Sequence, residues 1–300
     1  MTLKKLSDKV SQLRQEEKKR IQLQLLNSPP FFDIELSSKC NVSCIMCPRT
    51  RLRRKQELMS KDAINKLIDW LPNNSKAMIS GLGEPLLNDN IFLLANGLNK
   101  KGIEVGVTTN GVLLTYATIN NLISCNVNFI QISFNGASEK VYNSIMQGAD
   151  FSTVVDNLKY LAKIKKDHMT VKLAVTVQSH NKNDIANIRA FADDLGFEMF
   201  LRNLHSRAGA IYYADKRLDF SCGCGIFAKV TFIAANGEIL SCCQDMQGKF
   251  ILGNISNHSF DKIVLKKKKI IEKNIWFPIC NNCDDEYRYH LFFDNTIKGK

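Results

Sequence analysis

Three cysteines near the start of the chain have a spacing that suits a metal cluster. Cys40, Cys44 and Cys47 follow the pattern C-x3-C-x2-C, and no histidine lies near them. Structural zinc sites normally take four protein ligands, and catalytic zinc sites are usually rich in histidine. Thiolates are the usual ligands of iron–sulfur clusters, and three of them leave one iron open. We therefore expect an iron–sulfur cluster with an open iron, with zinc or unligated core cysteines as the alternatives.

A second group of cysteines lies toward the other end of the sequence. It consists of Cys222, Cys224, Cys242, Cys243, Cys280 and Cys283. Four thiolates from this group could hold a second iron–sulfur cluster, and a four-cysteine zinc ribbon is the alternative. The remaining cysteine, Cys125, ends a predicted helix and is expected in the core.

The composition is that of an ordinary globular protein. The 300 residues are 23% charged and 45% hydrophobic, which allows a large buried core. Apolar runs such as residues 91–95 are far shorter than the roughly 20 residues of a membrane span, and residues 1–20 contain no apolar signal core. We expect a cytoplasmic protein, in which thiols stay reduced and bind metal instead of forming disulfides.

The net charge of +12 indicates an acidic partner. No nucleic-acid-binding motif is recognised, so nucleic acid is disfavoured and an anionic small-molecule substrate fits better. Arginines in residues 49–55 could bind a phosphate or carboxylate, and a solvated loop is the alternative. The four lysines at 266–269 are expected to form an exposed helix face.

The elements that must position the first cysteines alternate between strands and helices. Residues 1–27 have the spacing of a helix that packs one face on the body. Strands are predicted over 31–38, 76–81, 103–110, 128–136, 171–179 and 198–204, and helices over 60–71, 88–102, 116–125, 151–166 and 183–196. This order predicts a parallel α/β sheet, either doubly wound or an incomplete barrel. Active sites of such sheets lie at the carboxyl ends of the strands, where the cysteine loop is expected.

The alternation stops after residue 205. Residues 229–243 are predicted to form a β-hairpin with its turn at Asn236-Gly237, and residues 259–273 a helix. We therefore expect a second, small domain from about residue 206 onward.

The first cysteine loop, CNVSCIMCPR, resembles the radical S-adenosylmethionine (SAM) superfamily. The resemblance implies a partial (β/α)6 TIM-like barrel over residues 31–205, preceded by an N-terminal helix over 1–30. It also implies that Cys40, Cys44 and Cys47 hold a [4Fe-4S] cluster whose open iron binds SAM. One electron from an external reductant, such as flavodoxin or ferredoxin, then cleaves SAM to a deoxyadenosyl radical that abstracts a substrate hydrogen.

Further residues match the family at the strand ends. Gly83-Glu84-Pro85 resembles the family's Gly-Glu-Pro loop, whose backbone meets the SAM amino group, although Leu82 stands where many members have a second glycine. A simple turn is the alternative, and Leu86 argues against a dinucleotide fingerprint. The other candidate SAM contacts are Thr109, Asn110, Ser133 and Gln178. Each of these side chains could instead serve only as a cap or strand-end hydrogen bond.

The C-terminal part, residues 206–300, resembles the shortened SPASM region called twitch, a β-hairpin plus helix with one auxiliary [4Fe-4S] cluster. The resemblance assigns its ligands as Cys224, Cys242, Cys280 and Cys283. A full SPASM region would need more cysteines than this tail holds. Four thiolates close the cluster, so its expected role is to accept an electron from a substrate radical.

The resemblance implies a radical SAM enzyme that oxidises or epimerises a small polar substrate, such as a sugar or cyclitol. The size and single auxiliary cluster are most similar to the butirosin-pathway deoxy-inosamine dehydrogenase type. Cys222 and Cys243 flank the assigned ligands, and a free thiol there could return a hydrogen atom in epimerisation; Cys243 is the candidate donor, and a structural residue or alternative ligand is the alternative for both. Arg202 is a candidate substrate or SAM contact, with packing as the alternative. The alternatives are a peptide-modifying maturase that makes a crosslink or epimer, and a non-catalytic iron–sulfur electron carrier.

Overall fold

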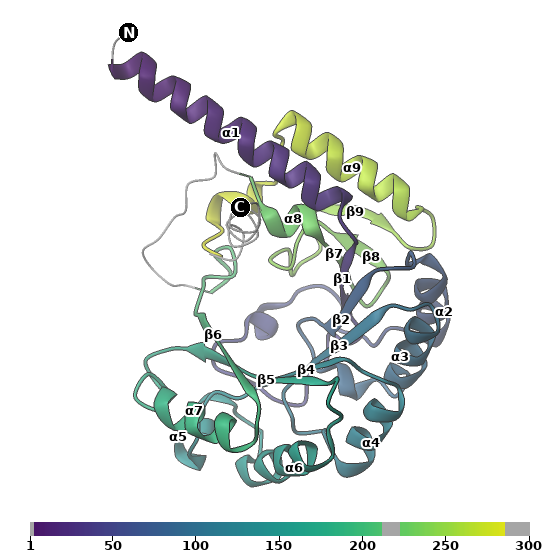
Figure 1. Cartoon of the computed structure of the whole chain (residues 1–300), viewed down its shortest axis with the longest axis vertical. Helices are drawn as coiled ribbons and strands as arrows, with labels where there is room; N and C mark the ends of the chain where they lie inside the picture. Colours follow the sequence, from purple (N-terminus) through teal and green to yellow (C-terminus); the bar gives the residue numbers. More distant parts are fainter. Residues whose placement is uncertain (1–2, 212–222, 286–300) are drawn as a thin grey trace.

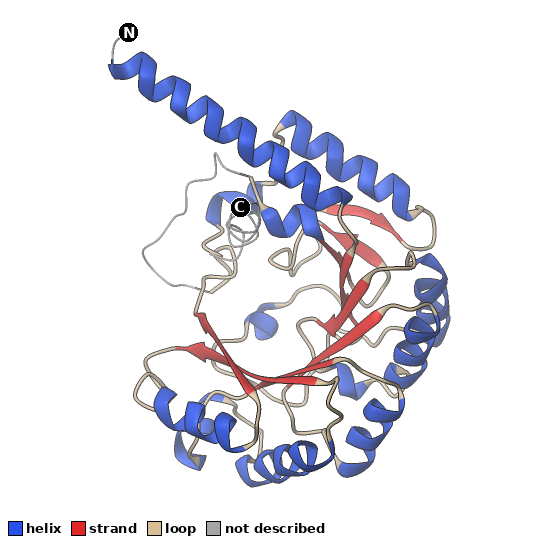
Figure 2. Cartoon of the chain, viewed as in Figure 1, coloured by secondary structure: helices blue, strands red, loops and turns tan. Residues whose placement is uncertain are grey.

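A single curved sheet organises the chain. The computed structural model describes residues 3–211 and 223–285. Its sheet has nine strands in the order β6-β5-β4-β3-β2-β1-β7-β8-β9, and helices cover the outer side of the curve (Figures 1 and 2). The strands are β1 (Phe31–Glu35), β2 (Lys76–Ser80), β3 (Glu104–Thr109), β4 (Phe129–Ser133), β5 (Thr170–Val177), β6 (Glu198–Asn203), β7 (Val230–Ile233), β8 (Glu238–Leu240) and β9 (Ile251–Asn254).

The first six strands are parallel and adjacent in chain order, which confirms the partial (β/α)6 barrel. The C-terminal hairpin does not form a sheet of its own. Strand β7 pairs in parallel with β1, and β8 and β9 extend the same sheet in antiparallel fashion. The hairpin turn is confirmed, since Gly237 adopts a φ of 80° and its amide bonds to the Ala234 carbonyl at 2.8 Å. The third strand, β9, was not predicted.

The helices are α1 (Leu3–Asn27), α2 (Lys61–Trp70), α3 (Ile91–Lys100), α4 (Tyr116–Ser124), α5 (Glu139–Ile145), α6 (Phe151–Ile164), α7 (Ile185–Asp194), α8 (Gly225–Lys229) and α9 (Phe260–Lys273). Five of the described helices begin at a short polar side chain that caps them: α2, α4, α5, α6 and α9. Ser60 accepts a hydrogen bond from the Ala63 amide, as its predicted cap role requires. Helices α5 and α8 were not predicted, because seven and five residues are too few to show a helical period.

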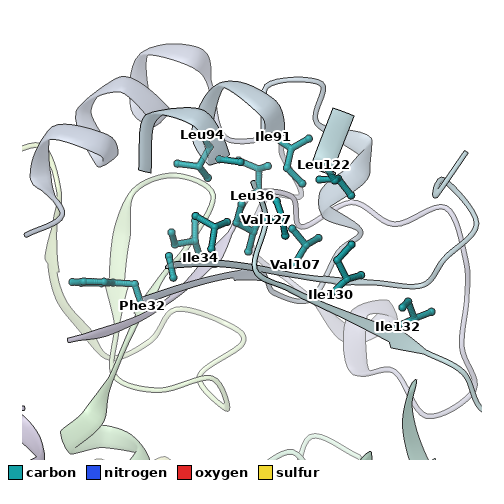
Figure 3. Close-up of a cluster of buried hydrophobic side chains, with 14 of the residues drawn as sticks. Phe32, Ile34, Leu36, Ile91, Leu94, Val107, Leu122, Val127, Ile130 and Ile132 are labelled. Atoms are coloured by element: carbon teal, nitrogen blue, oxygen red, sulfur yellow. The ribbon is translucent and has the colours of Figure 1, made fainter. Parts of the chain in front are cut away.

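The core lies between the sheet and the outer helices. Ile34 of β1 points toward Leu94 and Ile91 of α3, and all three are buried (Figure 3). The buried Phe32 ring packs edge-on against Trp70 of α2 and Phe260 of α9. Successive side chains of a strand point to opposite faces, so Asp33 and Glu35 face the concave side. We call that side the inner face.

The strand register places a row of polar side chains on the inner face. Asp33 is paired with Met78, and Thr176 with Arg202; paired residues share a face. Beyond the charged residues at the amino ends of the strands (Lys76, Glu104, Lys172 and Glu198), the polar members of this row include Asp33, Glu35, Ser80, Thr108, Gln131, Ser133, Thr176 and Arg202. The outer face is apolar and packed, so the inner face is where the sheet can bind a polar ligand.

Helix α1 confirms the predicted leader helix and packs its C-terminal half on the body. Ile21 and Leu25 are buried against the core, and the helix contacts α8 and α9. Lys229 ties the helix end down through hydrogen bonds to the Ser28 hydroxyl and the Pro29 carbonyl. The N-terminal half extends beyond the body (Figure 1).

Candidate active site

The first cysteine loop directly follows β1, where the parallel sheet ends. Its backbone is held by the end of α5 and the residues after it: the Ser43 amide bonds to the Gln147 carbonyl at 2.7 Å, and the Ile45 amide to the Ile145 carbonyl at 3.0 Å. Arg49 closes the loop by donating to the Val42 carbonyl at 3.0 Å. The unpredicted helix α5 is therefore part of the site's scaffold.

The three thiols of this loop are half-buried and close enough to affect one another's charge. Burial, reinforced by Cys47 and Cys40, raises the pKa of the Cys44 thiol to about 12. Such a thiol stays protonated until a metal takes the thiolate. The buried Tyr142 hydroxyl has no hydrogen-bond partner and lies within electrostatic reach of Cys44. Three soft donors and a spare hydroxyl fit an iron–sulfur cluster.

The Gly-Glu-Pro loop rests directly on the start of the cysteine loop. The Gly83 amide bonds to the Ser37 carbonyl at 3.2 Å, and the Glu84 amide to the Lys39 carbonyl at 2.8 Å. A β-carbon added at Gly83 would run into both of these carbonyl oxygens. Only glycine therefore fits at position 83 without moving the loop.

The Glu84 carboxyl ties the ends of two strands together. It accepts hydrogen bonds from the Thr109 hydroxyl at 2.8 Å, the Asn110 amide at 2.7 Å and the Leu86 amide at 3.1 Å. Burial raises its pKa to about 7, although all three hydrogen bonds lower it. The side chains of Glu84 and Thr109 thus bond to each other and to backbone, which ties the two loops together. Their contact with SAM stays a prediction.

The other predicted SAM contacts lie around the cysteine loop. The Asn110 amide group donates to Asn41 at 2.8 Å and lies 3.8 Å from the Cys40 sulfur. The Gln178 amide group lies 3.9 Å from the Met46 sulfur. Ser133 ends β4 on the inner face and is half-buried. The structure brings Asn110 and Gln178 to the loop, while the binding of SAM by any of them stays a prediction.

Residues without a motif also support this loop. The Met146 sulfur lies 3.4 Å from the Cys44 sulfur, and the Asn135 amide group lies 3.2 Å from Met146. Asn135 also accepts from the Thr176 amide at 2.8 Å. Sequence reasoning assigned Asn135 no role, because it stands where the resembled family commonly has aspartate.

Charged groups converge on the inner face between the two cysteine groups. The Ser80 hydroxyl donates to Asp33, and burial raises the pKa of Asp33 to about 6. The charge of Arg207, in the loop after β6, acts on Asp33, Cys47 and Cys243. Arg202, on the inner face as predicted, bonds to His205 at 3.0 Å. Sequence reasoning missed Asp33 and Arg207, which belong to no motif.

The second cysteine group lines one cavity. Its lining includes the predicted ligands Cys224, Cys242, Cys280 and Cys283, together with Cys243 and the aromatic rings of Phe227, Trp276 and Phe277. Burial raises the pKa of Cys242, and the Cys224 and Cys280 thiols raise it further. Cys222 lies outside the described residues.

The donors of this cavity fit a cluster. Four thiols share an apolar pocket, and the buried Gln244 side chain leaves its amide oxygen without a partner there. Within residues 3–211 and 223–285, no three Cys, His, Asp or Glu side chains converge closely enough for one metal ion. A four-iron cluster spaces its thiolate ligands more widely than a single ion does. The ligand assignments themselves stay predictions.

Each of the two basic stretches, residues 49–55 and 266–269, contains at least one side chain that bonds within the protein. Arg54 pairs with the buried Glu35 at 2.7 Å and bonds to the Met246 carbonyl at 2.7 Å, so it joins the first loop to the C-terminal region. Within the lysine run, Lys267 is only 2% exposed and donates to the Val230 carbonyl at 2.8 Å. The expectation of a uniformly exposed lysine face was therefore wrong at Lys267.

Comparison with known proteins identifies both parts of the chain. Residues 34–192 match the radical SAM superfamily, and residues 224–284 match the SPASM iron–sulfur cluster-binding domain. The first match covers more than half of the chain. These domains imply a [4Fe-4S] cluster with SAM in the barrel and further iron–sulfur binding in the C-terminal region.

Curated relatives match part of the chain at low identity. The tungsten-containing aldehyde ferredoxin oxidoreductase cofactor-modifying protein of Pyrococcus furiosus is 22% identical over 178 residues, 57% of this chain and 50% of the relative. The AdoMet-dependent heme synthase of Methanosarcina barkeri is 26% identical over 176 residues, 57% of this chain and 49% of the relative. The chain thus spans about half the length of the curated relatives it matches.

Solved structures share the fold. BtrN in complex with AdoMet and 2-DOIA aligns with a TM-score of 0.58 at 17% identity, over 86% of this chain and 94% of BtrN. Streptococcus suis SuiB bound to precursor peptide SuiA gives 0.65 at 16%, over 84% and 66%. The AdoMet-bound anSMEcpe gives 0.66 at 15%, over 90% and 98%.

The described residues include no helix that is both long and apolar enough to cross a membrane.

The barrel order, the cysteine loop and the matched residue ranges agree with one another. The chain therefore belongs to the radical SAM superfamily and carries a SPASM iron–sulfur region after its barrel.

Proposed function

We propose that this radical SAM enzyme oxidises a small polar substrate, such as a sugar or cyclitol, on the inner face of the barrel. The reaction would begin at a C–H bond, such as that of an alcohol carbon. One observation carries the proposal: both cysteine groups adjoin a polar inner face. The charge of Arg207 acts on Cys47 of the first group and on Cys243 of the second. A substrate bound there would lie between a radical source and an electron acceptor.

The proposed ligands are Cys40, Cys44 and Cys47 for the SAM-binding cluster, and Cys224, Cys242, Cys280 and Cys283 for the auxiliary cluster. When loaded, the first cluster and SAM supply a radical that takes a hydrogen atom, and the auxiliary cluster supplies an acceptor for one electron. The protein must then hold the substrate, exclude water and accept one proton. Gly83, Glu84 and Pro85, with Asn110, Ser133 and Gln178, are the proposed supports of SAM.

Asp33 is the side chain best placed to accept the proton. It projects from β1 onto the inner face, and Ser80 fixes its orientation by hydrogen bonding. With a pKa of about 6 it is mostly ionised at neutral pH, yet basic enough to take a proton in the reaction. Arg202 and Arg207 would bind the substrate's hydroxyl or anionic groups, and an external one-electron reductant such as flavodoxin or ferredoxin would reduce the first cluster.

Epimerisation is a second candidate, favoured by the position of Cys243. This thiol is half-buried and lines the cavity, and the charges of Asp33 and Arg207 act on it. Burial raises its pKa, so it keeps the S–H bond that a hydrogen donor needs. A peptide substrate is a further alternative, since SuiB, a structural neighbour, was solved with its precursor peptide.

The test is an anaerobic assay with iron–sulfur-loaded enzyme, SAM and dithionite. A metabolite extract is analysed before and after treatment, and deoxyadenosine is measured in parallel. Oxidation predicts a product two hydrogens lighter than its substrate. Epimerisation predicts a product of the same mass when the assay is run in H2O and a product that contains deuterium when it is run in D2O. If no deoxyadenosine forms, the proposal is wrong and an electron carrier is the better reading.

A further inference from the structure

A lysine is buried beside the cavity of the second cysteine group. Lys267 lies in the middle of α9 and is 2% exposed. Its ammonium donates to the Val230 carbonyl at 2.8 Å and to the Thr231 hydroxyl at 3.0 Å. The same ammonium lies over the Phe227 ring, with 5.5 Å between the nitrogen and the ring centroid. Among the described residues it forms no ion pair with a carboxylate.

Phe227 connects this lysine to the cavity. The ring lines the cavity together with Cys224, and the Phe227 amide bonds to the Cys224 sulfur at 3.4 Å. Burial lowers the pKa of Lys267 to about 7, whereas the negative charge of the Cys224 thiolate raises it. The Phe227 ring therefore lies against both the cavity and the Lys267 side chain.

A buried ammonium without a carboxylate is costly, because desolvation of an ion is offset only in part by neutral acceptors. The other buried positions of α9 are filled by Ile263 and Ile271, one turn away on either side. An apolar residue at 267 would suit this stripe. The missing countercharge can come from the cavity itself, since an iron–sulfur cluster with four thiolates carries net negative charge.

We propose that Lys267 is the countercharge of the auxiliary cluster and raises its reduction potential. The inference rests on the proposed ligand set of Cys224, Cys242, Cys280 and Cys283. The cluster becomes more negative by one charge when it accepts an electron. A fixed positive charge nearby stabilises this reduced state more than the oxidised state, because net charge is one of the factors that set such potentials. Lys267 would thus favour electron transfer from the substrate radical to the cluster.

The experiment isolates the auxiliary cluster in the full chain. Replacing Cys40, Cys44 and Cys47 by alanine removes the first cluster, and the remaining cluster is reconstituted anaerobically. Its potential is then measured by redox titration followed by EPR. In this background we compare Lys267→Gln and Lys267→Met, which remove the charge, with Lys267→Arg, which keeps it. Lys268→Gln is the matched control, because the Lys268 side chain is 51% exposed on the same helix.

Both neutral variants are expected to shift the potential to more negative values, with iron and sulfide content unchanged. Lys267→Arg and Lys268→Gln should retain the potential of the background. A potential that is equal in all variants overturns the inference while leaving the proposed cluster in place. If the background chain binds no iron and sulfide, the ligand set itself is wrong and the inference falls with it. Should the Lys267→Met variant fail to fold, the potential of the Lys267→Gln variant tests the inference, because its amide group can still donate to Val230 and Thr231.

Discussion

The two cysteine groups are built in opposite ways. The first is one short loop, Cys40 to Cys47, fixed to β1 and clamped by backbone hydrogen bonds to residues 145–147. The second gathers cysteines from three separate segments, at 224, at 242–243 and at 280–283, around one cavity. A local loop leaves an open corner for a cofactor, whereas a site assembled from several segments can enclose its contents. The difference matches a cluster that binds SAM and a cluster that only carries electrons.

The largest difference between the two groups is expected when one cysteine is removed from each of them in turn. Cys44→Ala should abolish deoxyadenosine formation entirely, because the open iron is lost with its cluster. Cys280→Ala should leave deoxyadenosine formation measurable while product formation fails, because the electron has no acceptor. The assay measures both products anaerobically. Equal loss of deoxyadenosine in both variants would show that the two groups do not have separate roles.

Asp33 is the proposed proton acceptor, so its replacement should affect proton removal from the substrate and leave SAM cleavage in place. Asp33→Asn should lower product formation by roughly 10²–10⁴-fold while SAM cleavage persists. With a pKa of about 6, the base is ionised above pH 6 and protonated below it. The wild-type rate should therefore fall as the pH drops through 6 and stay level above it. A wild-type profile that is flat from pH 5 to 8 would count against Asp33 as the base.

Gly83 tests the rigidity of the first loop. Gly83→Ala should destabilise the fold by about 1–3 kcal/mol and weaken SAM binding, because the added methyl group meets the Ser37 and Lys39 carbonyls. Thermal unfolding and SAM titration of the loaded enzyme measure the two effects. Gly102→Ala is a control outside the loop: its β-carbon would meet nothing within 4 Å, but its φ of 70° strains an alanine, so it should lower stability without changing SAM affinity. Similar SAM affinity in both variants would mean that the loop tolerates displacement.

Glu84→Gln is expected to have the smallest effect. One of the two carboxylate oxygens becomes an amide group, so a bond from the Thr109 hydroxyl or the Asn110 amide is lost at a cost of about 1–3 kcal/mol. The auxiliary cluster should be unaffected, and iron content and thermal stability are the readouts. Unchanged stability would indicate that the carboxyl does not hold the strand ends together.

Much of the first site could be predicted because its information is local. The spacing of Cys40, Cys44 and Cys47, the Gly-Glu-Pro loop and the alternation of strands and helices all follow from short segments. Its support could not be predicted in the same way. The contact between Cys44 and Met146 joins residues far apart in the chain, and helix α5 is too short for a periodic signal.

The C-terminal region was harder to predict because its structure depends on distant pairing. The hairpin was expected as a separate small domain, yet β7 pairs with β1 and continues the barrel sheet. Lys267 was misjudged from the run of four lysines. A signal was present, since Ile263, Lys267 and Ile271 are spaced four residues apart on the buried face of α9. Composition favoured exposure, whereas the helical period placed Lys267 inside.

The most direct test of the account is the EPR spectrum of the reduced, iron–sulfur-loaded protein before and after SAM is added. In wild type, SAM should change the signal of one cluster and leave that of the second unchanged. The variant that lacks Cys40, Cys44 and Cys47 should retain only the signal that does not respond to SAM. Zinc without inorganic sulfide, or spectra indifferent to SAM in the wild type, would contradict the proposed division between an open and a closed cluster.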